Sequence, residues 1–138
     1  MNNPNVNPNI EIRNPKQYRS TEIRNSKRFD LEKRTLNFTK MVRDYIKTLP
    51  KHTSNYEFSK QLIRSASSIG ANYIEANEAL GKKDFLMRIK ISKKETKETL
   101  YWLNLTEPND KEECLRQKLI KEAIELMNIF GAILRNSQ

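Results

Sequence analysis

The sequence predicts an all-α protein, an antiparallel up-down-up-down four-helix bundle with a flexible N-terminal arm. Three observations predict this fold. Apolar residues recur with helical spacing in four segments after residue 26. The chain has only three glycines and five prolines, and three of the prolines lie within the first fifteen residues. The connections between the four segments are short, so consecutive helices are expected to run antiparallel.

Residues 1–26 are expected to form the arm and residues 27–138 the bundle domain. The arm is rich in Asn, Pro and charged residues, and such a composition cannot bury enough apolar surface to form a core. Its basic residues outnumber its acidic ones, since it contains Arg13, Lys16, Arg19 and Arg24 against Glu11 and Glu22. Such an arm either follows the phosphate backbone of a nucleic acid or is a disordered tail.

The first two helices are predicted from Phe29 to Leu49 and from about Asn55 to Leu80. Pro50 ends the first pattern, and Gly81 is expected to end the second. The main apolar stripe of the second helix consists of Phe58, Leu62, Ala66, Ile69, Tyr73, Ala76 and Leu80. A second apolar face, about 100° round this helix, consists of Tyr56, Ile63, Gly70 and Ile74. A helix with two apolar faces is either central in its own bundle or shared with another subunit.

The third helix is predicted from about Lys83 to Leu105, and the fourth extends to about Arg135. The core-facing residues of the third are Phe85, Ile89, Ser92, Thr96, Thr99 and Leu103. Pro108 separates the two helices. The stripe of the fourth consists of Leu115, Leu119, Ala123, Leu126, Met127, Phe130, Ile133 and Leu134.

A strip of lysines on the third helix is the clearest electrostatic pattern of the chain. Its six members project into a sector about 120° wide at 100° per residue; they are Lys82, Lys83, Lys90, Lys93, Lys94 and Lys97. We call them the lysine strip. Like charges so close repel one another, so the strip is either a binding surface for an anionic partner or a solvated face relieved by nearby Glu. Only Tyr101 shares the sector, which favours recognition of a backbone or a shape over base stacking.

An apolar patch on the same helix consists of Met87, Ile91 and Trp102, with Glu95 nearby. Exposed apolar patches that contain Trp are typical of interfaces. Together with Ile63, Gly70 and Ile74 of the second helix, this patch predicts a homo-oligomer. The alternative is that the N-terminal arm covers it.

The polar residues of the middle helices do not predict a metal site. Bundles that hold two iron ions use Glu-x-x-His motifs, and the only histidine, His52, lies in a loop. We therefore expect Arg64, Asn72, Glu75 and Glu95 to be structural polar residues, with Glu75 or Glu95 pairing with Arg64 or with a lysine.

No catalytic residue or cofactor is predicted. The serines Ser65, Ser67 and Ser68 have no histidine to activate them, and the sequence has no Gly-x-Ser-x-Gly motif and no Gly-rich phosphate loop. Cys114 lies beside Glu112 and Glu113, and neighbouring carboxylates do not activate a thiol as a nucleophile. We expect a protein that is not an enzyme and has no small-molecule substrate.

The net charge of +9 favours polyanionic partners, because Lys and Arg near phosphates release condensed counterions. A single cysteine permits no intramolecular disulfide, which fits a reducing compartment. The sequence has no apolar run long enough to span a membrane and no secretory signal at its start. We therefore expect a cytoplasmic protein.

Two segments carry a resemblance to a known family. They run from Gln61 to Ala76 (QLIRSASSIGANYIEA) and from Lys83 through Glu98 to the Tyr-Trp-Leu at 101–103. Between about Phe29 and Ile133 the chain resembles the bacterial four-helix bundle proteins that include those encoded within intervening sequences of the 23S ribosomal RNA gene. The resemblance implies a ring, typically a pentamer. It also implies kinship with the accessory variability proteins of diversity-generating retroelements, which bind a reverse transcriptase and its template RNA.

These observations predict a non-enzymatic, basic, oligomeric scaffold that binds RNA or a ribonucleoprotein. The alternative is an interaction module for an acidic protein, without nucleic acid.

Overall fold

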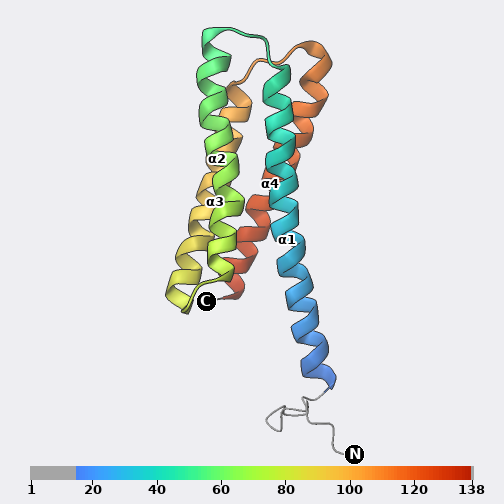
Figure 1. The fold of residues 1–138 in the computed structure, drawn as a ribbon, viewed down its shortest axis with the longest axis vertical. Coiled ribbons are helices and arrows are strands. Elements are labelled where there is room, and N and C mark those ends of the chain that lie inside the picture. The colour runs from blue at the N-terminus through green and yellow to red at the C-terminus, as the bar shows by residue number, and fades with distance from the viewer. Residues whose placement is uncertain (1–14, 138) are drawn as a thin grey trace, which may run out of the picture.

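The computed structural model describes residues 15–137 of the chain, and it describes side chains from Asp30 onward. Four α-helices follow one another: α1 (Pro15–Thr48), α2 (Thr53–Asn77), α3 (Lys82–Leu105) and α4 (Glu113–Asn136), with a short 3₁₀ turn at Asp110–Glu112 before α4. Residues 15–137 contain no β-strand. The predicted all-α four-helix bundle is confirmed, and Figure 1 shows its helices running alternately up and down.

The core lies where the four apolar faces meet. Each helix packs against the helices next to it in the chain, and α1 also packs against α4. The largest side chains with almost no exposed surface come from all four helices: Phe38, Val42, Tyr45, Leu62, Ile69, Ile89, Leu103, Leu119, Leu126 and Phe130. Burial of these side chains is the main term that favours the folded state.

α2 and α3 approach closely because small hydroxyl residues line their contact. Ser65, Ser92 and Thr99 are completely buried. The Thr99 hydroxyl donates to Ser65 Oγ at 2.9 Å, and the Ser92 hydroxyl donates to the carbonyl of Ile69 at 3.0 Å. Buried polar groups cost little when they are hydrogen-bonded in this way, so the contact is both close and satisfied.

A buried asparagine joins the two connections at one end of the bundle. The Asn55 side-chain amide donates to the carbonyls of Pro50 and Glu107, both at 3.0 Å. Its oxygen accepts from the backbone N–H of Glu107 at 2.9 Å. The α1–α2 connection is thereby tied to the residues that follow α3.

α1 begins at Pro15 rather than at Phe29, so the predicted start of the first helix is wrong. Proline suits the first position of a helix, and the Lys, Arg, Glu and Gln residues that follow favour helix even where no apolar stripe marks it. In Figure 1 this first part of α1 (blue) extends beyond the other helices. Residues 1–14 lie outside the described residues, so a flexible arm and a domain boundary at residue 26 stay predictions.

α2 ends at Asn77, three residues before the predicted end. Leu80, which the apolar stripe of this helix included, is fully exposed at 104%. The backbone N–H of Glu78 closes the helix, and Gly81 serves as the N-cap of α3 instead of stopping α2. The apolar pattern of α2 continues in the sequence to Leu80, although the helix ends at Asn77 and the chain then turns toward α3.

Gly70 was expected at a subunit interface, and this expectation is wrong. It is buried within the chain, where α2 crosses α1. A Cβ atom at position 70 would lie 2.9 Å from Thr35 Oγ1 and 3.2 Å from Thr35 Cβ. The missing side chain therefore lets α1 and α2 approach each other, and the second apolar face of α2 is partly used inside the bundle.

We expect Gly70→Ala to destabilise the protein by about 1 kcal/mol. Overpacking against Thr35 costs about 1–3 kcal/mol, and the better helix propensity of Ala offsets part of that cost. Urea unfolding of the variant measures the difference. Gly81→Ala adds a Cβ that meets no atom within 4 Å, so it should lose only the roughly 0.5 kcal/mol by which Ala is worse than Gly at the N-cap of α3. A double variant with Thr35→Ala should lose less stability than the two single changes together, and strict additivity would contradict this explanation.

Candidate functional site

All six members of the lysine strip are exposed on α3. None of them forms an ion pair with a carboxylate in the part of the chain whose side chains are described. Six unpaired ammonium groups on one helix raise the local electrostatic potential, which attracts anions.

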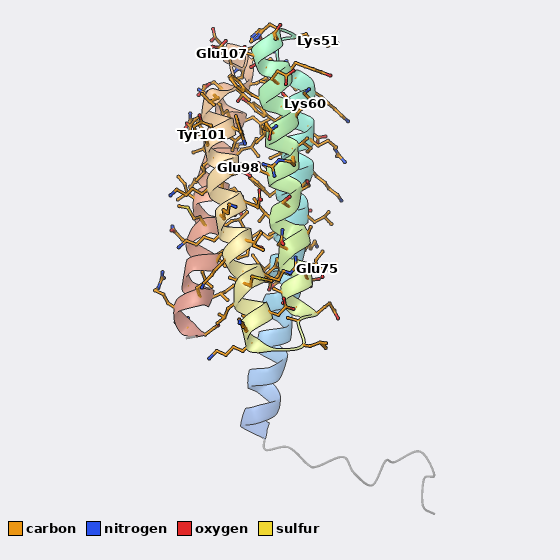
Figure 2. All side chains as sticks on the ribbon, turned by 90° about the vertical axis from the view of Figure 1, so that its left-hand side faces the viewer. Lys51, Lys60, Glu75, Glu98, Tyr101 and Glu107 are labelled. Atoms are coloured by element: carbon orange, nitrogen blue, oxygen red, sulfur yellow. The ribbon has the colours of Figure 1, made fainter. Side chains whose placement is uncertain are left out.

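The carboxylates of α3 are used on the other side of the helix, toward α2. Arg64 of α2 forms ion pairs with Glu98 and, at 3.6 Å, with Glu95. Asp84 pairs with Arg88 at 3.9 Å. Figure 2 shows Glu98 at the boundary between α2 and α3, and Tyr101 farther from α2. The three carboxylates of α3 therefore pair with arginines, and none of them forms an ion pair with a member of the lysine strip.

Glu95 is the most buried of these carboxylates, with 15% of its side chain exposed. Burial raises the pKa of Glu95, and a hydrogen bond and charge repulsion from Glu98 raise it further, whereas Arg64 and Lys94 act in the opposite direction. Its Oε2 atom has no hydrogen-bond partner, since Arg64 lies beyond hydrogen-bond distance. The ion pair compensates only part of the cost of burial.

Two other polar residues singled out in the sequence have different environments. The Asn72 side chain donates to the carbonyl of Ser68 at 2.9 Å and accepts from Arg88 at 3.2 Å. Glu75 is exposed and forms no ion pair in the described part of the chain. It lies three turns of α2 from Arg64, too far to replace Glu95 and Glu98. In Figure 2, Glu75 and Glu98 lie at clearly different heights.

The residues expected at a subunit interface differ in exposure. Ile74 and Met87 expose 50% and 49% of their surface, whereas Ile63, Ile91 and Trp102 are partly buried. Ile63 and Trp102 also pack against the core. Helical register places Ile63 and Ile74 near Gly70, on the α1 side of α2. It places Ile91 near Glu95, on the α2 side of α3, and Met87 between Ile91 and the lysine strip. The apolar residues therefore form two separate patches.

Trp102 closes the end of the α2–α3 contact. Its ring stacks on Phe58 of α2 with centroids 6.1 Å apart, and its neighbour Tyr101 meets it edge-on at 4.9 Å. The indole Nε1 atom is buried and has no hydrogen-bond partner. A buried indole N–H usually finds an acceptor, so this position costs some stability in the isolated chain.

One basic residue near the lysine strip was missed in the sequence. Arg135 of α4 lies beside Lys93, because both side chains pass over Gly131. The i, i+4 spacing of Gly131 and Arg135 signals that these two share a face of α4, but nothing in the sequence places Lys93 there.

Comparison with known proteins identifies the family. Residues 27–135 match the family model described as 23S rRNA-intervening sequence protein. The chain belongs to this family. A crystal structure of a protein with unknown function, from the S23 ribosomal protein family of Bacteroides thetaiotaomicron VPI-5482, is 28% identical in sequence. That likeness covers 75% of this chain and 96% of the other, with a TM-score of 0.66. No protein with a curated description matches the chain.

The matched residues include the lysine strip, Arg64 and Arg135. The resemblance noted in the sequence is thus confirmed for the 23S rRNA-intervening sequence protein family, and the kinship with retroelement accessory proteins stays a prediction. Among the described residues, no cluster of His, Cys, Asp and Glu could hold a metal ion. No helix in this part of the chain is long and apolar enough to cross a membrane.

The raised pKa of Glu95 predicts a pH-dependent effect of Glu95→Gln. Below the ordinary pKa of Glu, both the folded and the unfolded wild type are protonated at this site, so it contributes no pH dependence. As the pH rises through the raised folded pKa, the folded wild type must ionise a buried group, and its stability falls. The free energy of unfolding of Glu95→Gln relative to wild type should therefore increase from pH 4 to pH 8. A constant or decreasing difference in urea titrations would contradict the cause assigned here.

Proposed function

We propose that this protein is a non-enzymatic, oligomeric, basic scaffold that binds RNA or a ribonucleoprotein. The observation that carries the proposal is the separation of charge on α3. Its three carboxylates pair with Arg64 and Arg88, and the lysine strip has no carboxylate partner in the described part of the chain. A solvated helix face relieved by nearby Glu would have placed these carboxylates beside the lysines.

The composition of the strip favours contacts to a sugar–phosphate backbone. Among the residues with described side chains, Tyr101 is the one exposed aromatic beside the strip, and single-strand binders normally interleave several aromatics with basic residues. Structured RNA is bound largely through its phosphates, its 2′-hydroxyl groups and its shape. We therefore favour a structured RNA over an extended single strand.

The two apolar patches support an assembly of copies. The patch with Ile63 and Ile74 lies on the α1 side of α2, and the patch with Met87 and Ile91 lies between α3 and α2. If one patch contacts the other on the next copy, the interface is heterologous, and such contacts close into a ring when the rotation permits. This fits the ring, typically a pentamer, that the resemblance implies. If the protein belongs to a retroelement, the ribonucleoprotein partner would be a reverse transcriptase with its template RNA, in the cytoplasm.

Charge reversal of the strip should abolish RNA binding. In wild type the logarithm of the affinity for structured RNA should fall steeply with the logarithm of the salt concentration, because bound lysines release counterions. The triple variant Lys90→Glu, Lys93→Glu and Lys97→Glu should show no measurable binding by fluorescence anisotropy, while its assembly stays intact.

The control variant carries the same change of charge on α1: Lys33→Glu, Lys40→Glu and Lys47→Glu, three exposed lysines that form no described ion pair. It should retain most of the affinity. Salt-insensitive or absent binding by wild type would contradict an RNA scaffold. Capture of the same acidic protein before and after nuclease treatment would then favour a protein partner.

A charge in either apolar patch should disrupt the assembly. Ile74→Asp and Met87→Asp each replace an apolar side chain in the proposed subunit contacts by a hydrated carboxylate, and dehydrating that carboxylate on association is costly. Sedimentation velocity should show a shift to monomer for each variant. Leu80→Asp is the control, since Leu80 is fully exposed at the end of α2 and outside both patches. A monomeric wild type, or variants that sediment like wild type, would contradict these contacts.

A further inference from the structure

Gly131 of α4 has an unusual set of neighbours. It is buried, yet the three atoms nearest to a Cβ at this position are Arg135 Nη1 at 3.3 Å, Lys93 Nζ at 3.7 Å and Lys93 Cε at 3.9 Å. Gly70, in contrast, is crowded by the backbone and the Cβ atom of Thr35. Glycine within a helix is less stable than alanine. At position 131 it leaves room for the ends of two cationic side chains.

Neither of these cations is neutralised. Arg34, Arg43, Arg64, Arg88 and Arg116 each pair with a carboxylate. Arg135 is the one arginine with a described side chain that does not. Lys93 also forms no ion pair in the described part of the chain. The two distances to a common point limit the separation of Lys93 Nζ and Arg135 Nη1 to about 7 Å.

The helix dipole explains the position of Arg135 but not that of Lys93. Arg135 lies in the last turn of α4, where the negative end of the helix dipole attracts a cation. Lys93 belongs to α3 and has no such reason to be there. Lys90 and Lys97 lie within about one turn of Lys93 on the same helix and increase the positive potential.

We propose that Lys93, Gly131 and Arg135 form a seat for one phosphate group between α3 and α4. The guanidinium fork of Arg135 can donate two parallel hydrogen bonds to phosphate oxygens, and Lys93 adds a point charge. The seat gives the proposed RNA-binding function a defined contact and rests on it for the source of the phosphate. The same chemistry would also hold free phosphate, so the two sources need separate tests.

The first test uses inorganic phosphate as the probe and the full-length protein. Wild type should broaden the ³¹P resonance of phosphate in a chloride buffer of constant ionic strength. Gly131→Leu keeps every charge but fills the space between the cations, and the broadening should be lost. The double variant Lys93→Gln and Arg135→Gln leaves the core untouched and should lose it as well. The control double variant Lys40→Gln and Lys47→Gln, which removes the same charge from α1, should behave like wild type.

The second test adds an RNA duplex of about 20 base pairs. If an RNA phosphate occupies the seat, the duplex should displace inorganic phosphate from wild type. The double variant Lys93→Gln and Arg135→Gln should bind the duplex about tenfold more weakly at 0.1 M salt, with a salt slope shallower by about one.

The outcomes separate the seat from the general function. The seat would be overturned if wild type and the double variant Lys93→Gln and Arg135→Gln broadened the ³¹P resonance equally. It would also be overturned if the α1 control lost as much broadening as this double variant. RNA binding that persists unchanged in that seat variant would leave the RNA scaffold standing without this contact. Phosphate binding lost in the seat variants, together with no RNA binding by wild type, would assign the seat to free phosphate and contradict the RNA scaffold.

Discussion

The close packing of α2 against α3 determines how charge is distributed over the protein surface. Small hydroxyl residues bring the two helices together, and their hydrogen bonds leave no cost of an unsatisfied polar group at Ser65 or Thr99. At the rim of this contact Arg64 reaches both Glu95 and Glu98. Because α2 engages these carboxylates, they are unavailable to the lysines on the rest of α3. The basic surface is thus a consequence of how the bundle packs.

The energetic cost of leaving these cations unpaired is modest, because both lie at the surface. Their separation of at most about 7 Å corresponds to a repulsion of at least about 0.6 kcal/mol in bulk water, and salt screens it. A surface ion pair that neutralised one of them would gain about 0–1 kcal/mol. The folded state therefore tolerates an unpaired Lys93 beside Arg135. A phosphate group could contact both cations at once, and this interaction would be stronger than that of either cation with a flexible carboxylate.

Much of the fold could be predicted from the sequence, because helical periodicity reports which residues face the core. Helical register alone predicts that Ser92, Thr96 and Thr99 face the core, and all three are buried. Periodicity failed where no core contact constrains the chain. The beginning of α1 has helix-forming residues but no apolar stripe, and Leu80 continues a stripe past the end of α2.

The candidate site could be predicted only in part. The angular positions of lysines around one helix follow from their spacing in the sequence, so the sequence predicts the lysine strip. The proximity of Lys93 to Arg135 depends on how α3 and α4 pack, and the two residues are far apart in the chain. Gly70 is a second example. A small residue in a helix predicts that another backbone comes close, but the sequence does not tell whether that backbone is α1 or another copy of the chain.

On α3 the proposed subunit contact and the lysine strip meet at Met87. Helical register places Met87 beside Lys83, Lys90 and Lys94, whereas Lys93 lies on the α4 side, near Gly131. A contact between copies through Met87 and Ile91 would leave Lys93 and the α4 edge of the strip open on every copy. A ring would then repeat the lysine strip at regular intervals around its circumference. Weak phosphate contacts on one copy would raise the effective concentration of the RNA for the next, so moderate affinity at each strip is sufficient for tight binding by the assembly.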